Sequence, residues 1–82
     1  MVSTTVSVSQ RDGWHARPAS EFAKVVVNSG STVTVARPGQ TPVRGDSVLS
    51  LMALGAKHGE KLMITVNGTD EETVLNQLSS LF

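Results

Sequence analysis

VSTTVSV, residues 2–8, and ARPASEFAKVVV, residues 16–27, differ in the period at which their apolar side chains recur. The first stretch places valine or threonine at alternate positions, and β-branched residues at a period of two are typical of a strand with one buried face. The second stretch follows helical spacing, and Asn28-Ser29-Gly30 ends it. Its apolar positions are Ala19, Phe22, Ala23 and Val26. A strand that leads into a helix with one apolar face predicts an α+β domain.

The rest of the chain changes its period in the same way. We predict a strand at residues 33–35, a hairpin arm at residues 41–44 and a short helix at residues 48–54. A further strand follows at residues 62–66, and a closing helix at residues 69–81. Pro42 cannot donate a hydrogen bond to a neighbouring strand, which predicts that its arm lies at the edge of the sheet. Ser47 precedes the short helix as its cap, and Gly55 ends this helix. Thr69 and Glu72 form the capping-box pattern of the last helix.

The predicted order is β-α-β-β-α-β-α, and each of the longer elements has one apolar side. An open-faced β-sandwich buries all of these sides, with a four-stranded antiparallel sheet and three helices on one face. The helix between the first two strands fits a split β-α-β unit, in which the last strand lies between them. We expect residues 1–82 to form a single domain, because the chain contains no linker, repeat or low-complexity segment.

Composition limits the classes of function. Seven Lys and Arg balance seven Asp and Glu, and only three aromatic residues are present, which disfavours a nucleic-acid-binding role. The absence of cysteine removes disulfides and thiolate metal sites. Residues 1–10 lack the basic and apolar parts of a signal peptide, and no apolar run approaches the ~20 residues that span a bilayer. We therefore expect a cytoplasmic protein that does not insert into the membrane.

His15 directly precedes the first predicted helix. Backbone N–H groups at a helix start have no partner inside the helix, and the positive end of the helix dipole lies there. Such a position binds anions such as phosphate. Arg17 adds a guanidinium group that matches phosphate oxygens, and Pro18 stiffens the first turn, where a missing N–H costs little. The simpler interpretation is that His15 and Arg17 are ordinary surface residues.

Other catalytic interpretations have less support. Asp12, His15 and Ser20 could suggest a hydrolytic triad, but the chain has no Gly-x-Ser-x-Gly elbow and is too small for a deep cleft. His15 and His58 are too few ligands for a metal site, and His58 in its polar loop is expected to be exposed. No metal or other cofactor is predicted.

Two segments have a distinctive pattern: Gly13-Trp14-His15-Ala16-Arg17-Pro18-Ala19, and DSVLSLMALG at residues 46–55. The first resembles the active-site signature Gly-x-His-Ala-Arg-Pro-Ala of the HPr family, the histidine-containing phosphocarriers of the bacterial sugar phosphotransferase system. The second resembles the segment around that family's regulatory serine. The length and the element order agree as well, so the resemblance covers essentially the whole chain.

By this resemblance, the protein is a phosphoryl carrier and not an enzyme. His15 would accept a phosphoryl group on Nδ1 from phospho-enzyme I and pass it to a histidine on the EIIA unit of a sugar permease. Arg17 would neutralise charge on the phosphoryl oxygens, and the amides of Ala16 and Arg17 would hold the phosphate. Two alternatives stay open: a regulatory paralogue that signals by binding, and an unrelated α+β binding module, for example for RNA, which the neutral charge disfavours.

The resemblance also implies a docking surface beside the histidine. A two-turn helix cannot bury both of its sides, so Leu51 and Leu54 are expected to point inward, which leaves a patch outside. The predicted interface comprises Trp14, Ser20, Lys24, Val48, Leu49 and Met52. Trp14 stands where the family usually has an aliphatic residue: exposed, it would add to the docking surface, and buried, it would pack the loop.

Ser47 is predicted to cap the short helix. In proteins of Gram-positive type, the resemblance also makes it the target of a regulatory kinase. Such a kinase or a transcriptional regulator would be a further partner, and the protein itself is expected to be a monomer. Asp46 departs from the family, which commonly has Lys there, and its carboxylate would repel a phosphoserine. One extra residue in the stretch 37–45 is a further departure.

Overall fold

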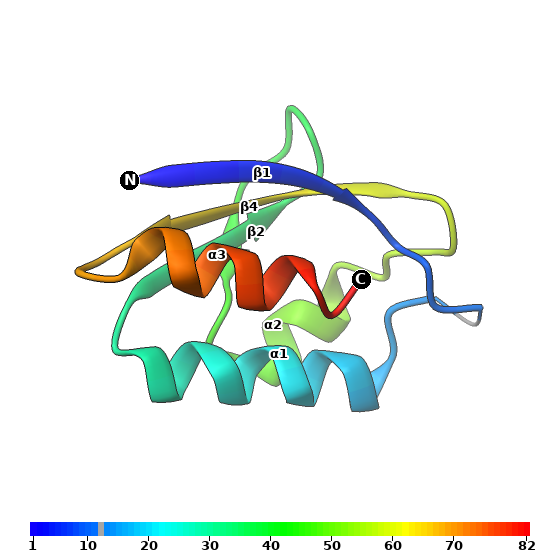
Figure 1. Cartoon of the computed structure of the whole chain (residues 1–82). Coiled ribbons are helices and arrows are strands. Elements are labelled where there is room, and N and C mark those ends of the chain that lie inside the picture. The colour runs from blue at the N-terminus through cyan, green and yellow to red at the C-terminus, as the bar shows by residue number, and fades with distance from the viewer. Residues whose placement is uncertain (12) are drawn as a thin grey trace.

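A computed structural model describes residues 1–11 and 13–82 of the chain, which fold into strands and helices in the predicted order (Figure 1). The elements are β1 (Val2–Ser7), α1 (Ala16–Ser29), β2 (Thr32–Ala36), β3 (Val43–Arg44), α2 (Val48–Ala53), β4 (Lys61–Asn67) and α3 (Glu71–Ser79). The period of the apolar residues, together with the turn before residues 41–44, therefore identified each of these elements.

The four strands form one antiparallel sheet in the order β1-β4-β2-β3. The last strand of the chain lies between the first two, as predicted, and Val66 near its end pairs with Val2 on one side and Val33 on the other. β3 is a two-residue edge strand directly after Pro42, which confirms the effect expected of that proline.

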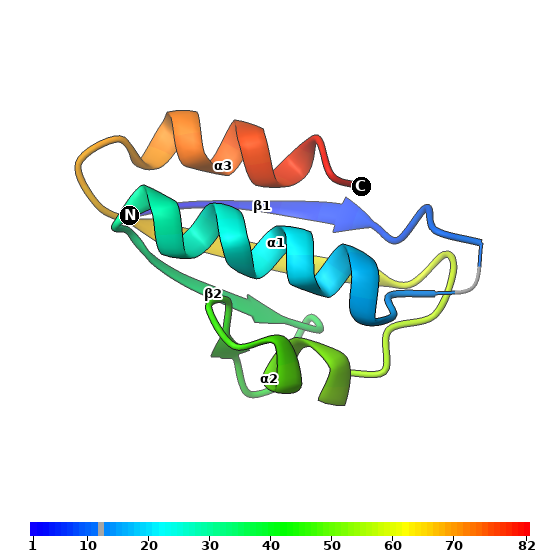
Figure 2. The same ribbon diagram turned by 90° about the horizontal axis from the view of Figure 1, so that it is seen from below.

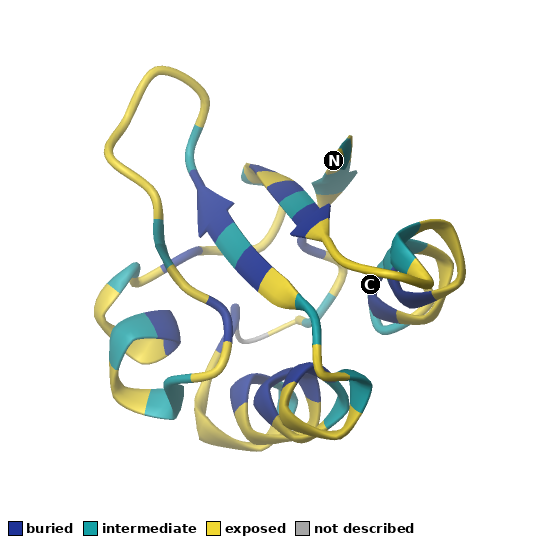
Figure 3. Cartoon of the chain, turned by 90° about the vertical axis from the view of Figure 1, so that its left-hand side faces the viewer, coloured by how far each residue is buried: buried dark blue, intermediate teal, exposed yellow. Residues whose placement is uncertain are grey.

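All three helices cover one face of the sheet (Figures 1 and 2). Helix α1 buries the four positions that its spacing predicted, and β4 turns Leu62, Ile64 and Val66 towards them. The opposite face carries Met63, which is 38% exposed. In Figure 3 the buried parts of α1 and α2 face the sheet. The open-faced α+β sandwich is confirmed.

The start of α3 differs from the prediction. Its N-cap is Asp70, and no side chain caps it. Glu71, and not Glu72, reaches back, and its carboxylate accepts a hydrogen bond of 3.3 Å from the N–H of Gly68. The capping box expected at Thr69 and Glu72 is therefore wrong, because the helix begins one residue later than the pattern indicated.

The helices are short or have a polar side. Within residues 1–11 and 13–82, none of them combines the length and apolar character that crossing a membrane requires.

Candidate functional site

His15 occupies the N-cap of α1 with its side chain exposed. Its backbone is extended, with φ −98° and ψ −166°, and its C=O accepts the first helical hydrogen bond, 3.1 Å from the N–H of Ala19. The imidazole makes no capping hydrogen bond. Both the ring and the helix start are therefore open to solvent.

The first turn of α1 presents two backbone donors that make no hydrogen bond to any described residue. The N–H groups of Ala16 and Arg17 precede the first residue that can bond within the helix, and Pro18 has no N–H. No acceptor for these two groups occurs among residues 1–11 and 13–82. This turn carries no acidic side chain. Among residues 1–11 and 13–82, the positive end of the helix dipole therefore has no acidic side chain in its own first turn to compete with an external anion.

Arg17 extends into solvent beside this turn. Its side chain is 86% exposed, and its Nε lies 3.8 Å from a carboxylate oxygen of Glu21, one turn further along. A surface ion pair at this distance holds a side chain weakly. No hydrogen bond joins Arg17 to His15 in the described part of the chain, so the guanidinium is free to turn towards an anion at the helix start.

Trp14 is buried, and its assignment to an exposed docking surface is wrong. It is 4% exposed. Its ring lies edge-on to Phe22 at 5.3 Å between centroids, and tilted against Phe82 at 5.4 Å. Of the two alternatives for this residue, packing beneath the loop is the one found, because the ring fills the gap between α1 and the last residues of the chain. Phe82 carried no signal in the sequence beyond being apolar.

Gly13 explains how the loop reaches the helix. It has φ +81°, and a Cβ atom there would lie 2.7 Å from the backbone oxygen of Ala56. The N–H of Trp14 donates a hydrogen bond of 2.8 Å to the same oxygen. Glycine is required because the chain must both adopt a left-handed conformation and pass close to another backbone.

Helix α2 lies alongside the half of α1 that begins at His15 (Figures 1 and 2). Its Leu51 is buried and Leu54 is half-buried, as predicted, while Val48 is half-buried. Leu49 is 81% exposed and Met52 is 41% exposed. Ser20 and Lys24 on α1 are exposed as well. Apart from Trp14, the predicted interface residues thus expose at least part of their side chains on neighbouring helices.

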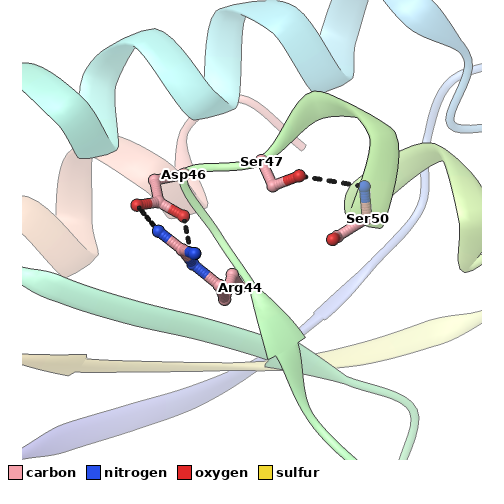
Figure 4. A network of polar contacts seen from close by, with 4 residues as sticks. All are labelled: Arg44, Asp46, Ser47 and Ser50. Carbon is pink, nitrogen blue, oxygen red and sulfur yellow. Dashed lines mark hydrogen bonds and ion pairs between the residues drawn. The ribbon is translucent and has the colours of Figure 1, made fainter.

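Ser47 caps α2, as predicted. Its hydroxyl accepts a hydrogen bond of 3.2 Å from the N–H of Ser50 (Figure 4). The preceding Asp46 accepts two hydrogen bonds from the guanidinium of Arg44, at 3.0 and 2.8 Å. These hydrogen bonds hold the pKa of the Asp46 carboxyl below its usual range.

The structure gives no support to the other candidate sites. His58 is exposed, as predicted. Asp12, the first member of the triad considered above, lies outside the described residues. Within residues 1–11 and 13–82, no three side chains of the metal-binding types gather. The hollow between α1 and α3 is lined by Val25, Asn28, Ser29, Gln77, Ser80 and Leu81, away from His15. The candidate site at the exposed start of α1 therefore lies outside this hollow.

Comparison with known proteins gives a consistent result. The family model described as "PTS HPr component phosphorylation site" matches residues 2–82. The phosphocarrier protein HPr of Streptomyces coelicolor is 35% identical over 81 residues, covering 99% of this chain and 87% of the relative. The phosphocarrier protein NPr of Proteus mirabilis is 31% identical over 77 residues, covering 94% of this chain and 86% of the relative. A crystal structure of HPr from Bacillus anthracis superposes with a TM-score of 0.89 at 29% identity, covering 98% of this chain and 94% of that one.

Proposed function

Because the chain belongs to the HPr family of phosphocarrier proteins of the phosphotransferase system, we propose that His15 is the residue that carries the phosphoryl group. It accepts this group on Nδ1 from phospho-enzyme I and delivers it to a histidine of an EIIA unit. The protein acts as a relay in the cytoplasm and catalyses no reaction of its own.

The transfer needs little covalent chemistry from the protein. A lone pair of the His15 ring attacks phosphorus as the P–N bond to the donor histidine breaks, and the donor nitrogen keeps that electron pair. The second transfer repeats this step with His15 as the donor. In such an in-line exchange between two nitrogens, positioning and charge supply most of the rate.

The observation that carries the proposal is the open start of α1. An exposed His15 stands at a helix N-terminus whose Ala16 and Arg17 amides have no partner among the described residues. A phosphoryl group on the imidazole would lie beside these donors, and Arg17 could add two charge-assisted hydrogen bonds. The same groups would stabilise the charge that develops on the phosphoryl oxygens during transfer.

Docking to the two partners is assigned to the exposed patch beside His15. Leu49 and Met52 supply apolar area, and the flexible thioether of Met52 suits a surface that must fit more than one partner. Ser20 and Lys24 form the polar rim on α1. An apolar centre with a polar rim is the ordinary composition of a protein interface.

Incubation with labelled phosphoenolpyruvate and enzyme I tests the assignment. We expect an acid-labile, base-stable adduct that disappears in His15→Ala and persists in His58→Ala, which removes the other histidine. An adduct with the stability of a phosphoserine, or labelling that survives in His15→Ala, would move the site elsewhere.

A second function at Ser47 has its own observation. The hydroxyl lies at the start of α2, beside the Leu49 and Met52 patch, and a phosphate there would add charge that a docking partner must oppose. Asp46 disfavours this modification, but Arg44 already neutralises its carboxylate. Incubation with ATP and an HPr kinase should label the protein but not Ser47→Ala, and the absence of label on the unmodified chain would exclude Ser47 as a target.

A further inference from the structure

The loop that carries His15 rests on the last residues of the chain. Trp14 packs against both Phe22 of α1 and Phe82, which follows α3. Phe22 and Phe82 also meet edge-on, with 6.1 Å between their ring centroids. The three rings form one cluster, and these are the only aromatic residues of the protein.

Two polar contacts fasten the same segments together. The side-chain amide of Gln10 donates a hydrogen bond of 2.9 Å to the C=O of Leu81, and the hydroxyl of Ser9 donates to the C=O of Phe82. Residues 9 and 10 follow β1 and lead towards the site, so the segment after α3 is attached to the loop through both its backbone and its ring.

We infer that Phe82 is a positioning residue for phosphoryl transfer, acting through Trp14 on His15; this inference rests on the proposed function. Trp14 is joined to His15 by a peptide bond, and it is also held by a backbone hydrogen bond to Ala56, the ring of Phe22 and the surrounding core. Without Phe82, one side of the indole loses its packing partner. The ring can then move, and the direction of His15 relative to the amides of Ala16 and Arg17 changes.

The geometry explains why this effect differs from ordinary destabilisation. Phe82 is half-buried, and the C-terminus that it forms lies beside α3, across α1 from the α2 helix that carries Leu49 and Met52 (Figure 2). Its loss should therefore slow the transfer step and leave partner binding unchanged. A displacement of reacting groups by about 1 Å is enough to slow a positioned reaction by as much as ~10²-fold.

The experiment compares Phe82→Ala with Val66→Ala as the matched control. Val66 is fully buried and pairs with Val2, at the end of β1 opposite the loop. Both truncations remove core packing, and urea titration gives the stability that each loses. Phe82→Tyr keeps the ring, and Gln10→Ala loosens the same segment by one hydrogen bond without touching the rings.

Three readouts separate positioning from stability. They are the amide NMR signals of Ala16 and Arg17, the emission of Trp14, which is the one tryptophan of the chain, and kcat and KM for phosphorylation by enzyme I. In Phe82→Ala we expect shifted signals, shifted emission and a kcat lower by about tenfold, with KM changed by less than about twofold. Phe82→Tyr should restore all three, and Gln10→Ala should change them in the same direction by less.

Equal effects in Val66→Ala, or unaltered amide signals and kcat in folded Phe82→Ala, would overturn the inference. If Phe82→Ala does not fold, Gln10→Ala decides in its place, and unchanged amide signals in that variant contradict the inference. Failure of the unmodified protein to accept a phosphoryl group would instead refute the proposed function. The NMR and fluorescence results would still decide whether Phe82 positions His15.

Discussion

The starts of α1 and α2 are built in opposite ways. At α2, the hydroxyl of Ser47 accepts a hydrogen bond from the Ser50 N–H, and a carboxylate precedes it at Asp46. At α1, His15 makes no capping bond, and the apolar residue Trp14 precedes it. A side-chain cap is worth about 1 kcal/mol. The chain thus uses this stabilisation at α2 and forgoes it at α1, which leaves the α1 start available to an anion from outside.

The largest effect is expected from replacing His15 at the start of α1 with a residue that can cap the helix. His15→Ser should place a capping hydroxyl there, whereas His15→Ala supplies none. Both variants should lose phosphoryl transfer completely, because both lose the nucleophilic nitrogen. In thermal or urea unfolding, His15→Ser should be more stable than His15→Ala by about 1 kcal/mol. Equal stabilities of the two variants would show that the start of α1 cannot be capped, and that the contrast drawn between the starts of α1 and α2 is wrong.

The next largest effect is expected from removing the positive charge of Arg17 beside the start of α1. Arg17→Ala should slow phosphorylation of His15 by about 10²-fold, the cost of removing one donor from a transition-state oxyanion. Its stability should change by less than ~0.5 kcal/mol, since the side chain is exposed. Glu21→Gln is the control: it removes the partner of Arg17, and the rate should not fall. A normal rate in Arg17→Ala would restrict the anion site to backbone groups.

The patch of Leu49 and Met52 on α2 should give a smaller effect, which is limited to partner binding. Met52→Glu should raise KM for enzyme I by about tenfold, because a buried charge at an interface costs more than 1 kcal/mol. Met63→Glu is matched to it, since the two methionines are 41% and 38% exposed on different faces of the protein. Equal KM values for the two variants would remove Met52 from the interface, and unfolding of Met52→Glu would place it in the core.

Removing the side-chain cap at the start of α2 should affect the stability of the protein more than phosphoryl transfer. Ser47→Ala leaves the Ser50 N–H without its acceptor and should destabilise the protein by about 1 kcal/mol in urea unfolding. Ser47→Asp provides another capping side chain and should recover most of this loss. Phosphorylation of His15 should proceed at the normal rate in Ser47→Ala, because this variant adds no charge beside the docking patch, and a slow rate in folded Ser47→Ala would mean that the two helix starts are coupled.

The smallest effect concerns the carboxylate that precedes α2. Hydrogen bonds from Arg44 hold the pKa of Asp46 below 3.8, its ordinary value. This pair therefore contributes to stability above that value, and the contribution is lost as the pH falls through the lower pKa of the folded state. In an NMR titration, Arg44→Gln should raise the pKa of Asp46 towards its ordinary value. An unchanged midpoint would show that Arg44 does not hold the carboxylate in solution.

Most of the fold could be predicted from the sequence because each element carries its own period. Alternation at residues 2–8 and helical spacing at residues 16–27 each describe one buried face, and Pro42 fixed an edge. The start of α3 was missed, because Thr69 and Asp70 are both good capping residues and only tertiary contacts select between them. A pattern of residue types predicts a helix better than it predicts its first residue.

The candidate site was predictable in part. His15, Arg17 and the cap at Ser47 follow from local chemistry, since each acts within one helical turn. The burial of Trp14 could not be predicted in this way, because one of the rings that it packs against, Phe82, lies 68 residues later in the chain. Such a long-range contact leaves no mark in either segment alone.

The central claim is that a phosphoryl group on His15 is held by the open start of α1. NMR spectra of the ¹⁵N-labelled protein, recorded before and after loading by phosphoenolpyruvate and enzyme I, test this most directly. The account predicts a phosphohistidine signal in the ³¹P spectrum and its largest amide shifts at Ala16 and Arg17, with Ser50 at the start of α2 unaffected. A phosphoserine signal, or largest shifts at the start of α2, would contradict it.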